Sequence, residues 1–571
     1  MRRKLIPYVA LLAAFGLGAC NEDSLVVSNP NAGETQRVLG TPDDAEKLLG
    51  SYYKRWYSGL YGAQGDNPPG TFEGMANVMS LQNYSSLANN CQNNRYPFTG
   101  ASNSNAPGNV CSGEQSRPYF ILSEVTRVAS NFLTNVAGGL SLGSTARENR
   151  DKSYAEFLRG ISLGYIALFY DSASVVVQGQ AGDDIGKLVA HPQVMDSAYA
   201  ALQRAIDLAN APATGSNGFP LPAEWIPSPT SFSAAEFVKL IRSYRALFRA
   251  NVARTPTERA AVNWDLVIAD AQNGISADHY NITSTTTGPG GGWRRIYDGG
   301  STWHQMPAFI IGMGDVSGSY EAWLKQPLGE RGAGNVGFFM VTPDLRFPQG
   351  TTRTAQQADF KVQDCEVAGV LSCKRYFTNR PGGNDQYTGV GWGWSNYDFN
   401  RFHGWATKGD AGSPRNGTLL VFPKTVVDML QAEGLIRKNQ FAQAAALINV
   451  TRVKNGLPAI TAFDGTTPVP GGAAACVPRV PQPPSASTVA CGNMLEAMKW
   501  EKRMEESFVQ YAAWFLDERG WGDLPEGTAL FWAVPYQDLQ ARGYNIGAIY
   551  GAGVGAGNAP NSVAGKSTYG W

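Results

Sequence analysis

Apolar residues recur at spacings of three and four along much of this chain, and this periodicity constrains its fold more than any other feature. Such spacing places the apolar side chains of a segment on one face of an α-helix. It predicts helices at about 117–138, 148–170, 190–209, 233–253, 262–275, 422–437, 440–454 and 494–518. A further helix is expected after Thr41-Pro42-Asp43-Asp44, which has the residue types of an N-cap, a first-turn proline and first-turn acids.

Several of these segments form helix–turn–helix pairs with small residues at close-packing positions. The pairs are 153–170 with 193–208, 234–253 with 263–275, and 426–438 with 440–453. They resemble divergent tetratricopeptide-type repeats, although a non-repetitive helical domain would also fit, because no strict period is visible. The predicted fold class is therefore mainly α, with tetratricopeptide-like helical pairs.

Two long polar, aromatic-rich insertions, at about 276–421 and 457–493, separate the helical blocks. Loops of that length without structure of their own are uncommon in a compact domain. We therefore expect a few short strands, 3₁₀ turns and ordered loops there. No Pro/Ser-rich linker or charge run divides the chain, so 41–571 is expected to form one large domain.

The first forty residues have the pattern of an export signal and a tether. Arg2, Arg3 and Lys4 precede a short apolar stretch, and Leu17-Gly18-Ala19-Cys20 fits the lipobox of bacterial lipoproteins. The expectation is a signal peptide at 1–19, a lipidated Cys20, and a tether at 20–40. No other segment approaches eighteen uninterrupted apolar residues, which a membrane-spanning helix requires.

Six further cysteines fall into three pairs that are local in sequence. Because an exported chain meets oxidising conditions, we expect three disulfides within loops; six cysteines nevertheless allow fifteen pairings. A zinc site is not expected, because no pair has Cys-x2–4-Cys spacing and the four histidines stand far apart. No metal and no cofactor are predicted. The candidate pairs are Cys91 with Cys111, Cys365 with Cys373, and Cys476 with Cys491.

The chain contains 47 basic residues (Lys and Arg) and 47 acidic residues (Asp and Glu), so its formal net charge is zero. A nucleic-acid partner would favour a concentrated basic surface, so none is expected.

The segment 494–524 combines an apolar helical stripe with charged residues. The stripe consists of Trp500, Met504, Phe508, Tyr511 and Phe515. Glu501, Lys502, Glu505 and Glu506 lie off it, so one side of the helix is expected to be buried and the other to face water. Gly520, Gly522 and Pro525 are expected to end the helix.

The residue order in this segment, Glu-x-Arg-x-Glu, Phe, Trp-Phe and Arg-x-Trp-Gly-Asp-Leu, resembles the C-terminal signature of SusD/RagB-like nutrient-binding lipoproteins. Gln431-Ala-Glu433, Ala445 to Asn449, Arg452 and Gly456-Leu457-Pro458 resemble a second block of that family. Val509-Gln510 and Ala512 depart from the family pattern, which suggests a divergent member. Ligand residues of other members are therefore not transferred to this chain.

The resemblance implies a lipid-anchored protein of the outer membrane that faces the cell exterior. Such a protein captures oligosaccharide and delivers it to a SusC-like TonB-dependent transporter, with the insertions forming the binding face. The alternatives are a peptide-binding or structural lid subunit of such a transporter and a surface glycoside hydrolase.

Sugars bind through ring faces stacked on aromatic side chains, with hydroxyl groups held by planar polar groups. Three segments have this composition. The candidate ligand-binding residues are Trp392, Trp394, Asn396, Tyr397, Asp398 and Trp405 in the first, Trp293, Tyr297 and Trp303 in the second, and Asn83 and Tyr84 in the third. The alternative for each aromatic residue is that it fixes the insertion onto the helices.

We predict no enzymatic activity. A glycoside hydrolase requires two carboxylates flanking a cleft, and Asp385, Asp398 and Asp410 are better explained as solvated surface groups. Glu501 and Glu505 are expected to pair with Arg503 or another arginine. Neither a Gly-x-Ser-x-Gly elbow, a His-Glu-x-x-His motif nor a dinucleotide-binding loop is present.

Overall fold

The computed structural model describes residues 41–61, 72–83, 105–109, 112–181, 184–212, 218–283, 305–331, 338–360, 365, 373–380, 394–407, 416–544 and 563–571. The chain divides into two units, Met1–Leu48 and Leu49–Trp571, and each is considered by itself. The predicted signal peptide, Cys20 and the tether lie outside the described residues.

Helices provide most of the regular structure, as predicted. The first, α3 (Pro42–Tyr61), begins at the predicted N-cap, where the Thr41 hydroxyl accepts a hydrogen bond from the Asp44 N–H at 3.3 Å. The longer helices that follow are α4 (Phe72–Met79), α5 (Ser112–Ala137), α6 (Thr145–Phe169), α7 (His191–Ala209), α8 (Ala234–Asn251), α10 (Trp264–Gln272), α16 (Lys424–Arg437), α17 (Phe441–Lys454), α18 (Met494–Glu506) and α19 (Ala513–Trp521). Short helices are α9 (Pro256–Ala260), α12 (Ala308–Ile311), η4 (Gly312–Gly314), α13 (Ser319–Leu324), η5 (Leu328–Glu330), α14 (Arg353–Asp359), α15 (His403–Thr407) and α20 (Tyr536–Ala541).

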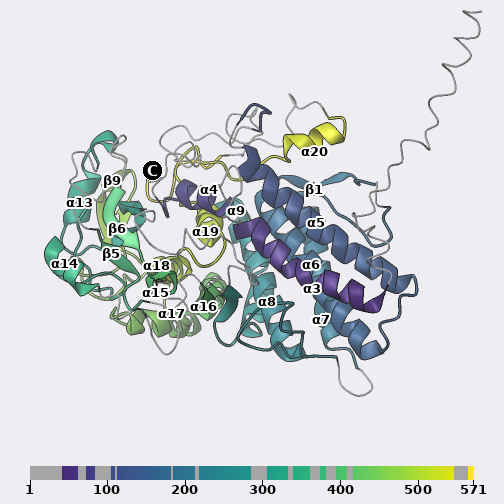
Figure 1. Cartoon of the computed structure of the whole chain (residues 1–571). Coiled ribbons are helices and arrows are strands. Elements are labelled where there is room, and N and C mark those ends of the chain that lie inside the picture. The colour runs from purple at the N-terminus through teal and green to yellow at the C-terminus, as the bar shows by residue number, and fades with distance from the viewer. Residues whose placement is uncertain are drawn as a thin grey trace, which may run out of the picture. The chain divides into compact units, whose positions relative to one another are not determined.

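The three predicted helical pairs are present. Helix α6 packs on α7, α8 on α10, and α16 on α17, and Figure 1 shows α6, α7 and α8 gathered side by side. Glycines make the closest approaches possible. A Cβ at Gly160 would lie 2.5 Å from Leu202 Cδ2 of α7, and one at Gly164 would lie 2.2 Å from Phe248 Cε2 of α8.

Short antiparallel strands occur in the described parts of both insertions, as expected. The first insertion also contains short α-helices, which were not expected: α12, α13, α14 and α15. Strand β3 (His279–Thr283) pairs with β7 (Gly417–Phe422), so the first and last strands of the first insertion lie together. A three-stranded sheet has the order β4 (Gln305–Pro307), β6 (Trp394–Phe399), β5 (Phe377–Asn379). The remaining two-stranded sheets are β1 (Ser172–Ser174) with β2 (Leu188–Ala190), and β8 (Arg479–Gln482) with β9 (Ser485–Cys491).

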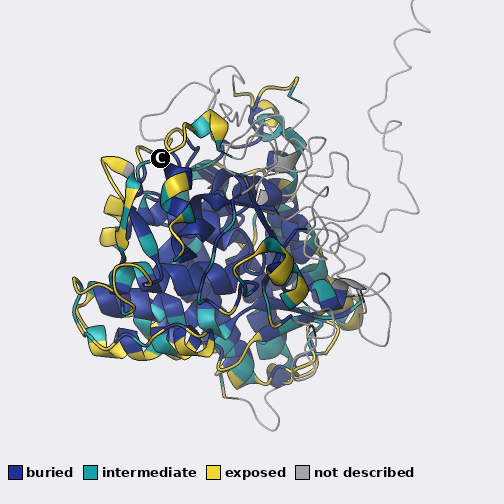
Figure 2. Ribbon diagram, turned by 90° about the vertical axis from the view of Figure 1, so that its left-hand side faces the viewer, coloured by how far each residue is buried: buried dark blue, intermediate teal, exposed yellow. Residues whose placement is uncertain are grey.

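The first insertion is joined to the helical part through a shared hydrophobic core. Phe347 stacks on Phe377 of β5 at a centroid distance of 4.2 Å and on Trp500 of α18 at 6.2 Å. Phe399 of β6 contacts Phe508, which follows α18, at 4.9 Å. In Figure 2 the buried residues fill the helices of the interior, and most exposed residues lie along the periphery.

The prediction of one helix over 494–518 is wrong, because the segment contains two helices. Helix α18 ends at Glu506, α19 begins at Ala513, and the residues between them form a turn. Phe508 and Ala512 adopt left-handed backbone conformations, with φ of 54° and 50°. Phe508 and Tyr511 lie in this turn and are buried. They therefore continue the apolar spacing of α18 into α19, and the sequence has the pattern of a single helix.

The prediction that the charged face of this segment meets water is also wrong. Glu501, Lys502, Glu505 and Glu506 are all buried. Arginines from other elements cover them: Arg346 lies 2.9 Å from Glu501, and Arg401 lies 3.4 Å from Glu505. The expectation that Glu501 and Glu505 pair with an arginine is thereby confirmed. Apolar periodicity identified one buried face, but it carries no information on what covers the other.

Residues 567–571 return to the same core. The Tyr569 hydroxyl accepts a hydrogen bond from Arg503 at 3.2 Å and donates one to Glu496 at 2.7 Å. Thr568 donates to Asp523, which also pairs with Lys499 at 3.2 Å. These contacts complete the surroundings of charged groups on α18.

Two of the three predicted cysteine pairs are disulfides in the structure, Cys365–Cys373 and Cys476–Cys491. Cys91 and Cys111 lie outside the described residues. Among the described helices, none combines the length and the apolar character needed to cross a bilayer.

Candidate functional site

A pocket of about 360 Å³ opens where the first insertion meets the end of α17. Strands β3 and β7, the segment leading into β5, the turn after β6, and the last turn of α17 each contribute side chains. The lining residues are Asp278, Tyr280, Leu345, Cys373, Lys374, Tyr376, Arg401, Phe402, Leu420, Lys454 and Asn455.

Tyr376 and Arg401 form the rigid part of the pocket. The Arg401 guanidinium carbon lies 4.1 Å from the centroid of the Tyr376 ring. Both side chains are fixed by Glu505 of α18: the Tyr376 hydroxyl donates to its carboxylate at 3.0 Å, and Arg401 donates to its backbone oxygen at 3.0 Å. Burial alone would lower the pKa of Arg401, but Tyr376 and Glu505 outweigh it and raise that pKa, so the guanidinium stays charged.

Tyr280 is the half-buried aromatic residue of the pocket. The β3–β7 register places it opposite Leu420. Its hydroxyl donates to Asp278 at 3.3 Å. Burial and the Asp278 charge raise the pKa of Tyr280 to about 12, so the phenol remains neutral at physiological pH.

Exposed Lys374 and Lys454 provide amino groups in the lining, and Asn455 adds an amide. The Asn455 amide nitrogen donates to the Thr451 carbonyl at 2.9 Å, which fixes the orientation of this amide. The pocket therefore combines aromatic rings with planar and charged hydrogen-bonding groups. Such a lining can hold a polar ligand that also presents a flat apolar face.

The sequence-predicted ligand residues that the structure describes lie in the core. The Tyr397 hydroxyl donates to Gln356 at 2.8 Å, and Asp398 pairs with Arg380 at 3.0 Å. Asn396, Trp405 and Asn83 are also buried. In the structure, these buried side chains pack the insertion and the segment after α4 against the rest of the molecule. A role of these residues in ligand binding stays a prediction.

The other predicted ligand residues fall outside the described part of the chain. They are Tyr84, Trp293, Tyr297, Trp303 and Trp392, and of Trp394 only the backbone is described, at the start of β6. The predicted segment is nevertheless close in sequence to the pocket. Strand β6 ends at Phe399, and Arg401 and Phe402, which line the pocket, follow two and three residues later.

Sequence reasoning missed Tyr280, Tyr376, Arg401 and Asn455 as pocket residues. Tyr376 lies three residues after Cys373, which was predicted to form a disulfide. Its closeness to a cross-linked loop could have indicated that Tyr376 has a fixed position. Nothing local indicated Tyr280, because its position depends on the pairing of β3 with β7 at the far end of the insertion.

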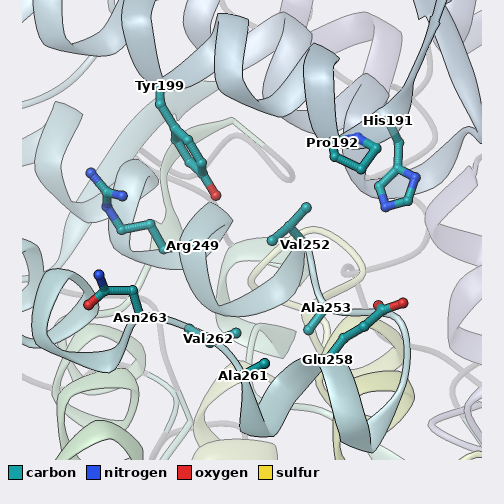
Figure 3. Close-up of a pocket in the computed structure, with 10 residues that line it drawn as sticks. All are labelled: His191, Pro192, Tyr199, Arg249, Val252, Ala253, Glu258, Ala261, Val262 and Asn263. Carbon is teal, nitrogen blue, oxygen red and sulfur yellow. The ribbon is translucent and has the colours of Figure 1, made fainter.

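A second pocket, of about 440 Å³, lies between α7, the end of α8 and α9 (Figure 3). In Figure 3 Tyr199 and Arg249 lie on one side of it, and His191 and Glu258 lie on the other. Arg249 stacks over Tyr199 at 4.8 Å and is held by Asp270 at 2.8 Å. Burial lowers the pKa of His191 to about 3, so this histidine is neutral.

The smaller pocket is the better candidate for a polar ligand. Valine, alanine and proline side chains form much of the lining of the larger pocket. Its Asn263 is already used as the N-cap of α10, where it accepts from the Leu266 N–H. The pocket at Tyr280, Tyr376 and Arg401 instead offers more than one aromatic residue and belongs to the insertion predicted to bind ligand.

Comparison with solved structures shows similarity to SusD superfamily proteins. A SusD homolog from Parabacteroides distasonis matches with a TM-score of 0.52 and 11% identity, over 87% of this chain and 93% of the other. A SusD superfamily protein from the same species matches with a TM-score of 0.50 and 12% identity, over 88% and 98%. A SusD superfamily protein from Bacteroides thetaiotaomicron gives the same values.

No protein-family model matches the chain, and no curated protein matches it at a significant level. At these identities the structural similarity shows the fold alone. The chain has the SusD-like fold. This confirms the predicted fold class, and it confirms the resemblance to SusD-like proteins at the level of structure.

Proposed function

We propose that this chain is a surface binding protein that captures an oligosaccharide and passes it to a SusC-like TonB-dependent transporter. The observation that carries the proposal is the pocket formed by Tyr280, Tyr376 and Arg401 in the first insertion. The SusD-like fold supports the same reading.

The lining suits a sugar for two physical reasons. A phenol ring offers an apolar surface to the C–H groups of a pyranose face, and planar or charged groups bond to its hydroxyls. The Arg401 guanidinium and the Asn455 amide are held in place by neighbouring groups. Lys374 and Lys454 line the same pocket. A volume of about 360 Å³ lies in the usual range for small-ligand sites and suits a short stretch of sugar rather than a whole chain.

Binding without catalysis is part of the proposal. Glycoside hydrolysis uses a pair of carboxylates on either side of the scissile bond. Among the described residues that line the pocket, Asp278 is the one carboxylate, and it accepts a hydrogen bond from the Lys424 N–H at 2.8 Å. Incubation of the purified chain with each bound glycan tests this claim, and release of shorter sugars would overturn it.

The proposed location is the outer face of the outer membrane, through lipid on Cys20. The sequence Leu17-Gly18-Ala19-Cys20 supports it. Labelling with radioactive palmitate is expected in the parent chain and absent in Cys20→Ala. Co-purification of a large outer-membrane barrel from native membranes tests the transporter partner separately. Recovery of the chain alone, in gentle detergent, would contradict that part of the proposal.

Affinity-gel electrophoresis and calorimetry with a panel of polysaccharides test the ligand class. We expect Tyr280→Ala to weaken binding of the retained glycan about tenfold, since one lost stacking contact of roughly 1.4 kcal/mol corresponds to that factor. Tyr544→Ala is the matched control, because Tyr544 is 46% exposed and lies outside the pocket. Equal losses in both variants would show that the effect is not local to the pocket.

The aromatic residues predicted from sequence are tested in the same assay. Trp303→Ala, Trp392→Ala and Trp394→Ala are expected to reduce affinity if the segments that carry them extend the binding face. If no polysaccharide binds and neither these variants nor Tyr280→Ala change the affinity of any ligand, the carbohydrate proposal fails.

A further inference from the structure

A third pocket, of about 310 Å³, lies between the start of α9, the end of α19 and the segment 563–568. Arg254 and Arg519 lie among its lining residues, and both are buried, at 4% and 1% exposed. The pocket is separate from the proposed glycan site, because the two share no lining residue.

Among the described residues, the guanidinium hydrogen bonds of both arginines go to backbone carbonyls. Arg254 donates to the oxygens of Ala167 and Tyr170 at 3.0 and 2.6 Å. Arg519 donates to the oxygens of Leu168, Leu530 and Asn251, each at 2.8 Å. In both side chains the Nε–H has no hydrogen-bond partner among the residues that the structure describes.

Other buried cations of the described chain have a carboxylate within 4 Å. They are Arg159, Arg245, Arg259, Arg346, Arg380, Arg401, Arg452, Lys499, Lys502 and Arg503. Within the described ranges, Arg254 and Arg519 are the buried cations without such a partner, and they line one pocket. Burying a charge without a counter-ion is costly, so this departure calls for an explanation.

Asp171 and Glu258 act on this pair, but neither forms an ion pair within 4 Å with one of its guanidinium groups among the described contacts. Burial lowers the pKa of Arg254 to about 10, although Asp171 and Glu258 act against it. Burial and then the charge of Arg254 lower the pKa of Arg519 well below its ordinary value. The Glu258 carboxylate accepts from the backbone N–H of Arg254 at 2.5 Å rather than from its guanidinium.

The remaining lining reinforces the positive potential. Lys566 is exposed at the pocket, Thr255 and Thr568 contribute hydroxyl groups, and no carboxylate is among the described lining residues. Asp523, which accepts from the Thr568 hydroxyl, is already paired with Lys499 and Arg503. A concave site with three cationic side chains and no acid attracts anions.

We propose that this pocket binds a small oxyanion, a carboxylate, sulfate or phosphate group, which supplies the negative charge that Arg254 and Arg519 lack. The two buried guanidinium groups provide the positive potential, and Lys566 with the Thr255 hydroxyl provides the contacts at the opening, because the Thr568 hydroxyl already donates to Asp523. The group comes either from a free anion or from an acidic substituent on a larger ligand.

The test measures binding of sodium sulfate, phosphate, acetate and galacturonate to the purified mature chain by calorimetry at constant ionic strength, with chloride as the background anion. Saturable binding of at least one oxyanion is expected. Selective binding of galacturonate over acetate would identify an acidic sugar as the source, and preference for sulfate or phosphate would identify a free anion.

Gly565 allows a variant that leaves the arginines untouched. A Cβ there meets no atom within 4 Å, so Gly565→Asp places a carboxylate at the pocket without steric conflict. We expect it to weaken oxyanion binding at least tenfold, whereas the nearly isosteric Gly565→Asn retains binding within about threefold, since charge is the difference between them. Lys566→Gln is expected to give an intermediate loss.

Thermal unfolding provides a second readout, because a bound anion stabilises the native state. Sulfate also stabilises proteins generally, so the measured quantity is the difference in its effect between Gly565→Asp and Gly565→Asn. The absence of saturable oxyanion binding, or equal binding by these two variants, would overturn the proposal. Arg254 and Arg519 would then serve to hold the carbonyl groups of Ala167, Leu168 and Tyr170.

Discussion

Three buried carboxylates converge on Arg346, a residue with no exposed surface in its side chain. Its guanidinium lies 2.7 Å from Asp344, 2.9 Å from Glu501 and 3.3 Å from Glu505. Trp500 donates a further hydrogen bond to Asp344 at 2.9 Å. Two of the charged residues of α18, Glu501 and Glu505, are therefore paired with a residue that comes from the first insertion.

Removal of this guanidinium is expected to destabilise the fold strongly. Arg346→Ala leaves Asp344 and Glu501 buried without their closest counter-ion and Glu505 with Arg401 alone. A broken buried pair costs about 3 to 5 kcal/mol. Urea unfolding followed by tryptophan fluorescence measures the loss. Arg55→Ala is the control: Arg55 pairs with Glu124 at 2.7 Å, but both side chains are substantially exposed, so about 0 to 1 kcal/mol is expected. Similar losses in the two variants would contradict the role assigned to Arg346.

Glu501 makes stability depend on pH near neutrality. Burial raises its pKa from 4.5 to about 7, with Arg346 acting against the shift. The native state therefore keeps a proton that the unfolded chain releases. The resulting stability is fully present below pH 4.5 and is lost as the pH rises through 7.

Glu501→Gln removes this titration and approximates the protonated form. The parent is expected to lose roughly 2 to 3 kcal/mol relative to the variant between pH 4.5 and pH 8. Urea unfolding of both proteins across that range measures the difference. A difference that is constant with pH would show that Glu501 does not titrate between these values.

At the scale of single elements, local periodicity was sufficient to predict α6, α7, α8, α16 and α17. Their apolar faces are set by nearby residues, and the spacing of those residues is visible in sequence. The turn between α18 and α19 was not predictable in this way. Its left-handed positions are held by Phe508 and Ala512, whereas glycine or asparagine usually marks such positions.

Helix α6 depends on the absence of side chains at two contacts. Gly164→Ala would bring a methyl group to 2.2 Å from the Phe248 ring, so this ring or α8 itself would have to move. We expect a loss of about 1 to 3 kcal/mol, as for other overpacked cores. Gly329→Ala, where the methyl group meets no atom within 4 Å, is expected to change stability by less than about 0.5 kcal/mol. Chemical denaturation distinguishes the two, and a neutral Gly164→Ala would show that the helices can separate at low cost.

For the whole molecule, the fold class was readable from sequence, but the candidate site was only partly so. The pocket proposed as the glycan site lies largely in the first insertion, where the sequence also predicted the binding face, and that placement stays a prediction. The pocket residues come from β3, β7 and α17, and long-range pairing rather than any local pattern brings them together. Tyr397 and Trp405 of the predicted aromatic segment instead lie in the core that the insertion shares with the helical part.

The disulfide Cys476–Cys491 joins two parts of the second insertion, just before α18 begins. It closes a loop of 15 residues, for which the chain-entropy model gives about 3 kcal/mol. Replacement of both cysteines by alanine is expected to lower the free energy of unfolding by about that amount. A reductant should then affect the parent more than the variant in thermal unfolding. An equal response would place the sensitivity at other cysteines.

Tyr569 makes two charged groups of α18 depend on a residue that is distant in sequence. Its hydroxyl joins Arg503 to Glu496, which lie 66 and 73 residues earlier in the chain. Both groups also have partners on nearer elements, since Arg503 pairs with Asp523 and Glu496 with Lys499. A change in the segment 567–571 would therefore reach the interior of the molecule and not its surface alone.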